Sequence, residues 1–181
     1  MFRLCLALAA IVSAVFATQA AADTVTGNVL AGTLSLSSSA GPAISFTLNG
    51  SDQSVDYTLP FSVIDATGSG TGWNLTVTST QFTTGGGSPK TLPTDSSKMR
   101  GRTSACTAGT CTNATNSINF PPPQTIPAGS TPPTALKFFQ AAASSGRGSI
   151  TVTPTIRMSL QANAYAGIYT STLTVAVVSG P

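Results

Sequence analysis

Residues 43–77 read AISFTLNGSDQSVDYTLPFSVIDATGSGTGWNLTV, and this stretch decides the fold. Its apolar side chains recur at every second position, which is the period of β-strands and not of helices. Turn residues separate the runs at Asn49-Gly50, Pro60 and Gly68-Ser69-Gly70, as short antiparallel connections require. The apolar positions are Ile44, Phe46 and Leu48, then Val55, Tyr57 and Leu59, then Phe61 and Val63, and then Trp73, Leu75 and Val77.

The C-terminal part of the chain repeats this pattern. In its last run we expect the odd-numbered residues to face inward and Thr170, Thr172, Thr174 and Ala176 to face outward. The two halves together predict an all-β protein, a single antiparallel β-sandwich domain. The apolar positions of this part are Ile150 and Val152, then Ile156, Met158 and Leu160, and finally Tyr169, Leu173, Val175 and Val177.

Two stretches do not follow the strand pattern. Residues 134–144 contain Leu136, Phe138, Phe139 and several alanines, which predict two or three turns of helix before Gly146. Residues 85–133 contain runs of glycine and proline and few apolar side chains, and they predict a long Gly/Pro-rich loop excursion on the surface.

The N-terminus has the pattern of a signal peptide over residues 1–22. Arg3 supplies a positive charge, an apolar run extends from Leu4 to Phe16, and alanines at 20–22 favour cleavage before Asp23. The apolar run is too short for a transmembrane helix, and nothing of comparable hydrophobicity follows it. We therefore expect an exported domain over residues 23–181, with no transmembrane segment.

The composition excludes several classes of function. The chain has no His and no Glu, so neither a Ser-His-Asp nor a Cys-His arrangement can be built, and we expect no enzyme and no cofactor. The expected mature chain has seven basic and five acidic side chains, which is not the charge of a nucleic-acid-binding domain. Asp52, Asp56 and Asp65 match no calcium-loop spacing, so we expect no metal site.

Two local features remain as candidates for shaping or binding. Cys106 and Cys111 are the only cysteines after the leader, and in an exported chain they predict a disulfide. Four basic residues fall within the expected loop, opposed only by Asp95, and they are Lys90, Lys98, Arg100 and Arg102. They predict either a solvated loop with scattered charge or a basic loop that meets anionic polymers such as teichoic acids or phospholipid headgroups.

The chain resembles a known family at two places. FSVIDATGSGTGWNLTVTSTQF, residues 61–82, is similar to the signature of the WxL domain, and SLQANAYAGIYTSTLTVAVVSGP, residues 159–181, is similar to the closing strand of that family. AAASSGRGS, residues 141–149, fits the glycine-bearing stretch before that strand. The family usually has a second Trp-x-Leu in its last strand, where this chain has Val175-Ala176-Val177.

The resemblance implies a bacterial surface protein that attaches non-covalently to the cell wall. The implied partner is peptidoglycan or another envelope polysaccharide, with other surface proteins as further partners. Trp73 and Leu75 form the family motif, and they lie two apart, so that both side chains leave the same face of a strand. Either this face belongs to the core or the indole lies partly open and stacks on a sugar ring.

Three hypotheses about function follow from the sequence. The leading one is attachment to the cell wall or to an envelope polysaccharide through Trp73 and the surface around it. The alternative is a structural subunit of a surface layer, pilus or coat, assembled through β-strand edges. The third is an adapter that binds another protein through the proline-rich loop.

Overall fold

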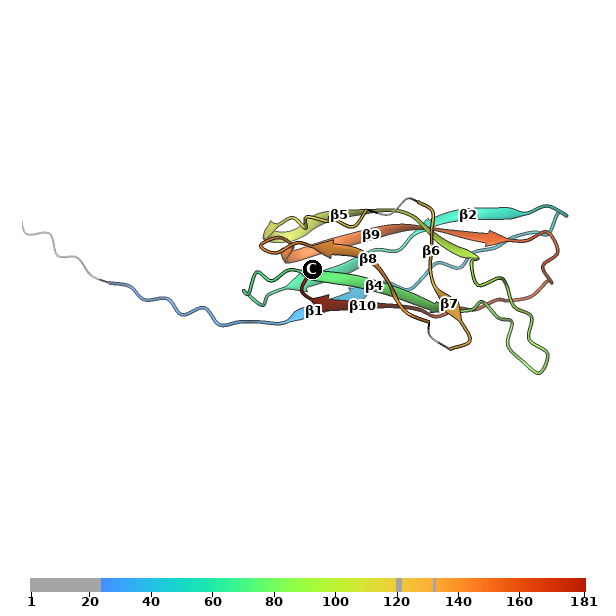
Figure 1. Ribbon diagram of the computed structural model, residues 1–181, viewed down its shortest axis with the longest axis horizontal. Helices are drawn as coiled ribbons and strands as arrows, with labels where there is room; N and C mark the ends of the chain where they lie inside the picture. The colour runs from blue at the N-terminus through green and yellow to red at the C-terminus, as the bar shows by residue number, and fades with distance from the viewer. Residues whose placement is uncertain (1–23, 120–121, 132) are drawn as a thin grey trace, which may run out of the picture. The chain divides into compact units, whose positions relative to one another are not determined.

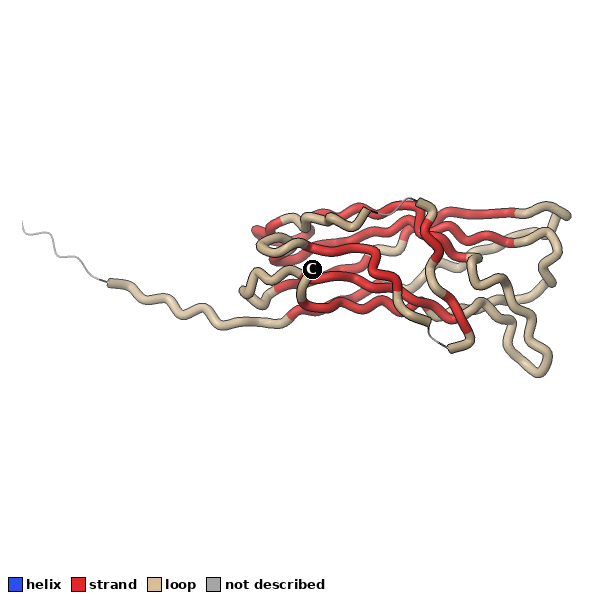
Figure 2. The backbone as a smooth tube through the Cα atoms, in the orientation of Figure 1, coloured by secondary structure: helices blue, strands red, loops and turns tan. Residues whose placement is uncertain are grey.

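The computed structural model describes residues 24–119, 122–131 and 133–181. The expected leader, residues 1–22, lies outside the described residues. The chain separates into two units: residues 24–30 of the first unit have no regular structure, and Ala31–Pro181 carries all the strands. Figure 2 shows strands and loops in the described residues and no helix, so the all-β prediction is confirmed. None of the described residues forms a helix that could cross a membrane.

Ten strands form two sheets (Figure 1), called here sheet A and sheet B. Sheet A contains β1, β2, β3, β5, β6 and β9, and sheet B contains β4, β7, β8 and β10. The strands are β1 (Leu34–Ser38), β2 (Gln53–Thr58), β3 (Phe61–Asp65), β4 (Trp73–Thr80), β5 (Ser97–Thr112), β6 (Gln124–Thr125), β7 (Ala128–Gly129), β8 (Leu136–Ala141), β9 (Arg147–Leu160) and β10 (Leu173–Ser179).

Strand β9 is the centre of sheet A. Along one edge it pairs with β5, and along the other it pairs first with β3 and then with β2, all antiparallel. Pro154 has no N–H to donate to a ladder, and it falls in the gap between the part of β9 paired with β3 and the part paired with β2. β1 pairs only with β3, so its other edge is free of any strand in the described residues.

Strand β4 is the centre of sheet B. It pairs with β10 on one edge and with β8 on the other, while the short β7 runs parallel to its end. β10 has no second strand neighbour in the described part of the chain, and it lies near β1, so the free edges of the two sheets face the same side. The core between the sheets is made of alternating residues: Val63, Trp73, Leu75, Val77, Met99, Ile126, Phe138, Phe139, Ala141, Ile150, Val152 and Ile156.

The terminal strand has the predicted orientation. Leu173, Val175 and Val177 are half-buried and pack against the core, whereas Thr174 and Ala176 are exposed. The prediction that the odd-numbered residues face inward is therefore confirmed.

The predicted helix at residues 134–144 is wrong, because β8 occupies its centre. The register between β4 and β8 shifts between Leu75 and Thr76, and this irregularity lets the consecutive residues Phe138 and Phe139 both face the core. Two adjacent apolar residues do not alternate, so the strand did not show period two. The packing of both rings in the core between the two sheets then outweighs the helix propensity of the alanines.

The predicted loop excursion at residues 85–133 is also wrong over much of its length. It contains β5, a strand of 16 residues, together with the short β6 and β7. Met99 and Ile126 from this stretch are buried in the core. Register shifts near Gly101, Ala108 and Thr112 interrupt the alternation in β5. The other residues of β5 are mostly small or polar, so they show no apolar period of two in the sequence.

One further expected strand is absent. Residues 43–48 alternate between half-buried Ile44 and Phe46 and exposed neighbours, but they form no ladder. Within the described part of the chain, the backbone of this segment makes one hydrogen bond, which the Thr47 carbonyl accepts from Gln53 Nε2 at 2.8 Å. The segment is therefore placed by its side chains, while its backbone groups stay available.

Candidate functional site

Trp73 lies in the core at the start of β4. Its relative exposure is 0%, and its ring packs against Phe139 with the ring centroids 5.7 Å apart. The indole Nε1 donates a hydrogen bond of 2.9 Å to the carbonyl of Gly146. A buried indole N–H needs such a partner. Of the two interpretations of Trp73, this burial favours the core, and the ring offers no face to a sugar in this structure.

At two glycines near Trp73 the backbone lies so close to neighbouring atoms that no side chain would fit. Gly146 has a φ of 68°, and a Cβ there would meet the Trp73 Nε1 at 2.8 Å and the Ala141 Cβ at 2.4 Å. Gly72 has a φ of 77°, and a Cβ there would meet the carbonyl oxygen of Ala141 at 2.3 Å. The backbone thus closes directly over the indole, as only glycine permits. The sequence signal was the glycine-bearing stretch at 141–149.

The last strand completes this closed end. β10 runs antiparallel to β4, with Val175 opposite Val77 and Val177 opposite Leu75. The two segments in which the chain resembles the family are therefore neighbouring strands of sheet B. Leu75 is fully buried, like Trp73.

The three basic candidates do not form one cluster. Lys98 and Arg100 lie on β5 before and at a register shift, and Arg102 follows it. The shift reverses which positions face inward, so Arg102 pairs with the buried Pro154, and its Nη2 donates to the carbonyl of Ile118. This burial lowers the pKa of Arg102. Arg102 is therefore tied to its own chain at the inner side of the sheet.

Lys98 instead shares the outer face of sheet A with residues that sequence reasoning missed. It lies opposite Arg157 of β9 and pairs with Asp95 at 3.1 Å. Arg157 binds Asp56 of β2 with two hydrogen bonds of 2.6 and 2.8 Å. The hydrogen bond from Arg157 lowers the pKa of Asp56, and the same bond raises the pKa of Arg157.

Arg100 is the exposed cation of this face. Among the described residues it takes part in no salt bridge or hydrogen bond, although its charge helps to lower the pKa of Asp56. A shallow polar hollow of about 350 Å³ on this face is lined by Asp95, Lys98 and Arg157 among others. We call this surface the charged face: Lys98, Arg100, Arg157, Asp56 and Asp95, with the hollow lined also by Asp52, Gln53, Ser54, Ser96, Ser159 and Gln161.

The hydroxyl groups of β9 extend the charged face. Thr151, Thr153 and Thr155 alternate with the buried core residues, so they lie on the same outer side as Arg157. Threonine hydroxyls both donate and accept hydrogen bonds, as the hydroxyl groups of a sugar require. The face can therefore hold a polar polymer by hydrogen bonds and charge.

The predicted disulfide between Cys106 and Cys111 is present, and it lies in β5 and not in a loop. The two Cα atoms are 6.0 Å apart. The bond closes the irregular part of the strand where the register with β9 shifts between Ala108 and Thr112. Gly148 has a φ of 91°, and a Cβ there would meet the Cys111 Cβ at 2.8 Å, so the disulfide packs directly on β9.

The three aspartates considered for calcium have separate roles. Asp56 binds Arg157, Asp52 accepts a hydrogen bond from the Ala162 N–H at 2.8 Å, and Asp65 accepts bonds from the backbone N–H and hydroxyl of Thr67. No group of three or more metal-ligating side chains gathers within the described ranges.

A second surface runs along the side where the free sheet edges lie. We call it the lateral groove, and it consists of three adjoining hollows of about 300, 390 and 460 Å³ that share residues. Its walls are residues 36–48 on one side and 165–175 on the other, and its floor is Leu59, Phe61, Leu92, Met158 and Leu160.

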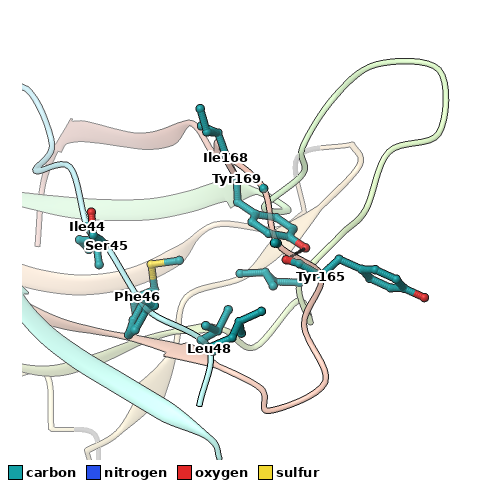
Figure 3. Close-up of a pocket in the computed structure, with 12 residues that line it drawn as sticks. Ile44, Ser45, Phe46, Leu48, Tyr165, Ile168 and Tyr169 are labelled. Carbon is teal, nitrogen blue, oxygen red and sulfur yellow. Dashed lines mark hydrogen bonds between the residues drawn. The ribbon is translucent and has the colours of Figure 1, made fainter. Parts of the chain in front are cut away.

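The widest part of the lateral groove is drawn in Figure 3. Ile44, Phe46 and Leu48 follow one wall, and Ile168 and Tyr169 follow the other, with the ring of Tyr169 above the space between them. Tyr165 turns outward and is 63% exposed, with Lys90 Nζ 4.6 Å from its ring centroid. The residues that line the groove carry no charge.

These features define a class of protein, a small β-sandwich with a charged surface on one sheet face and an apolar groove along one side. A family model described as "WxL domain surface cell wall-binding" matches residues 15–179. The chain belongs to the WxL domain family, a family of cell-wall-binding surface domains and not of enzymes. Searches of curated proteins and of solved structures gave no significant match.

Proposed function

We propose that the protein is exported and attaches non-covalently to peptidoglycan or another polysaccharide of the bacterial envelope. The observation that carries this proposal is the match of a cell-wall-binding domain over most of the chain. The predicted leader at residues 1–22 supports export, and the hydrogen-bonding outer side of sheet A supports a polar polymer as ligand.

In this proposal the polysaccharide lies on the charged face. Lys98 supplies positive charge in the lining of the polar hollow, and the exposed Arg100 supplies a second positive charge near Asp56. The threonines of β9 supply hydroxyl groups on the same outer side of sheet A. Hydrogen bonds to charged groups contribute about 1.5–3 kcal/mol each, more than neutral ones. Trp73 and Leu75 contribute by building the sandwich that holds this face, and Arg102 contributes by fixing the chain near Ile118 to β5.

The test is sedimentation with isolated cell-wall sacculi. The exported protein should sediment with them, and the double variant Lys98→Gln/Arg100→Gln should bind about tenfold or more weakly with an unchanged β-type circular dichroism spectrum. Arg147→Gln is the matched control, because Arg147 is an exposed cation at the other end of β9. Failure of the parent protein to sediment would contradict attachment, and equal binding by the double variant would contradict the charged face as its site.

A further inference from the structure

The lateral groove has the features of a site that accepts an additional β-strand. Its floor is apolar, and Leu59, Phe61, Met158 and Leu160 keep 3–8% of their surface exposed there. Neither wall has a ladder partner on the groove side: residues 43–48 and 166–169 show no backbone-to-backbone hydrogen bond within the described ranges. Buried backbone groups without partners are costly, and a free edge is a template for a further strand.

A segment of this same chain has the complementary pattern. Val25 and Val29 are 95% and 94% exposed, and polar residues alternate with them from Thr24 to Asn28. In an extended conformation Val25, Gly27, Val29 and Ala31 would leave one face, and Thr24, Thr26, Asn28 and the 82% exposed Leu30 would leave the other. This is the alternation of a strand that buries one side.

The length and charge of the segment also fit the groove. Residues 24–31 span about 26 Å when extended, and a fully extended chain of the length of the wall at 165–175 would span about 36 Å. Neither the segment nor the lining of the groove has a charged side chain, so insertion would bury no ion.

The segment cannot fill the groove of its own molecule over its length. Gly32 N–H donates to the Ala66 carbonyl at 2.8 Å, and Ala66 N–H donates to the Thr33 carbonyl at 3.1 Å, so the ladder of β1 continues back to residue 32. A segment that reversed before Gly32 would have about six residues left, or about 20 Å. These are fewer residues than the groove wall at 36–48 contains.

We propose that the lateral groove binds residues 24–31 of a second copy of this chain as an additional strand. The groove and the segment are different surfaces, so the contact is head-to-tail and continues from copy to copy into a fibre. The groove shares only Leu160 with the lining of the polar hollow, so assembly leaves the charged face free for a polysaccharide.

The test uses protein exported behind its own leader, with the N-terminus read from the intact mass. Analytical ultracentrifugation at rising concentration should show oligomers, and electron microscopy should show fibres. Val25→Asp should abolish them, because it places a charge on the inserted face. Thr26→Asp is the matched control, since it places the same charge on the opposite face, and it should keep the oligomers.

A complementation experiment tests the two surfaces separately. Deletion of residues 23–31 removes the segment and keeps the groove, whereas Ile168→Glu charges the groove at a residue that is 84% exposed and keeps the segment. Each variant alone should be monomeric, and their mixture should give a one-to-one dimer that grows no further.

Three outcomes would overturn the proposal. They are a parent protein that stays monomeric at every concentration, oligomers that persist after deletion of residues 23–31, and a monomer in which this segment is protected from proteolysis by its own groove. Sacculus binding by the deletion variant is measured in parallel. It should equal that of the parent, so that a failure of assembly and a failure of wall attachment are distinguished.

Discussion

The Trp73 end of the sandwich and the lateral groove are built on the same two central strands, but they differ in what completes them. At the Trp73 end the indole N–H and both edges of β4 have partners within the chain: Gly146 accepts from the indole, and β8 and β10 pair with β4. Along the lateral groove, residues 43–48 and 166–169 have no ladder partner within the described ranges, and large apolar side chains such as Ile168 remain exposed.

This difference indicates that the Trp-x-Leu motif stabilises the fold, while other residues form the surfaces proposed to bind. The Trp-x-Leu motif and the glycine-bearing stretch at 141–149 lie at the closed end, where they stabilise the domain. Residues 165–175, which belong to the other matching segment, instead form a wall of the lateral groove. The Trp-x-Leu motif itself lies in neither the charged face nor the lateral groove, so it does not mark the proposed contact surfaces.

The largest expected effect is at Trp73. Trp73→Ala should lower the free energy of unfolding by about 3–5 kcal/mol, because it removes a fully buried ring and leaves a cavity. Ile168→Ala, on the wall of the lateral groove, should change it by less than about 0.5 kcal/mol. Urea unfolding of both variants measures the contrast, and similar losses would contradict the distinction between a closed and an open region.

The glycine over the indole should have the next largest effect. Gly146→Ala adds a Cβ that meets Ala141 and Trp73, whereas Gly85→Ala adds one at nearly the same φ, 67°, with nothing within 4 Å. Gly85→Ala should cost about 1 kcal/mol from the backbone alone. Gly146→Ala should cost about 1–3 kcal/mol more, from overpacking. Equal thermal stability of the two variants would contradict the expected cost of overpacking a Cβ at position 146 against Ala141 and Trp73.

The disulfide should contribute about 2 kcal/mol, since the loop it closes is short. Cys106→Ser/Cys111→Ser should therefore shift the urea midpoint downward and leave the fold intact. In the parent protein, alkylation without reduction should label neither cysteine. Ready labelling of both would contradict a formed bond.

A small change in stability is expected at Val175. It borders a hollow of about 300 Å³ with Leu36, Phe61 and Leu173, so Val175→Trp has space and should cost less than about 1 kcal/mol. The new ring restores the tryptophan position of the second family motif and fills one end of the lateral groove, so it should weaken the oligomers. A variant that is destabilised by several kcal/mol would show that the groove is closed at this end.

The sequence predicted the regular strands and missed the irregular ones. Period two was visible in β3, β4, β9 and β10, because each buries every second residue without interruption. It was hidden in β8 and β5, where register shifts break the alternation. The alternation at residues 43–48 was real, but pairing depends on a neighbour that the sequence pattern does not reveal.

The candidate site was predicted less completely than the fold. Lys98 and Arg100 were found from local charge, but the shift in β5 that turns Arg102 inward could not be read from spacing. Asp56 and Arg157 were missed as a pair because they are 101 residues apart and meet only through the pairing of β2 with β9.

The most direct test of the separation between folding and binding uses Trp73 as a probe, since it is the only tryptophan in the chain. Quenching of its fluorescence by iodide is measured on the folded protein, with and without soluble cell-wall fragments. The indole should be inaccessible to iodide in both states, even at fragment concentrations that saturate binding. An indole that iodide quenches in the free protein, and that wall fragments then protect, would contradict the account.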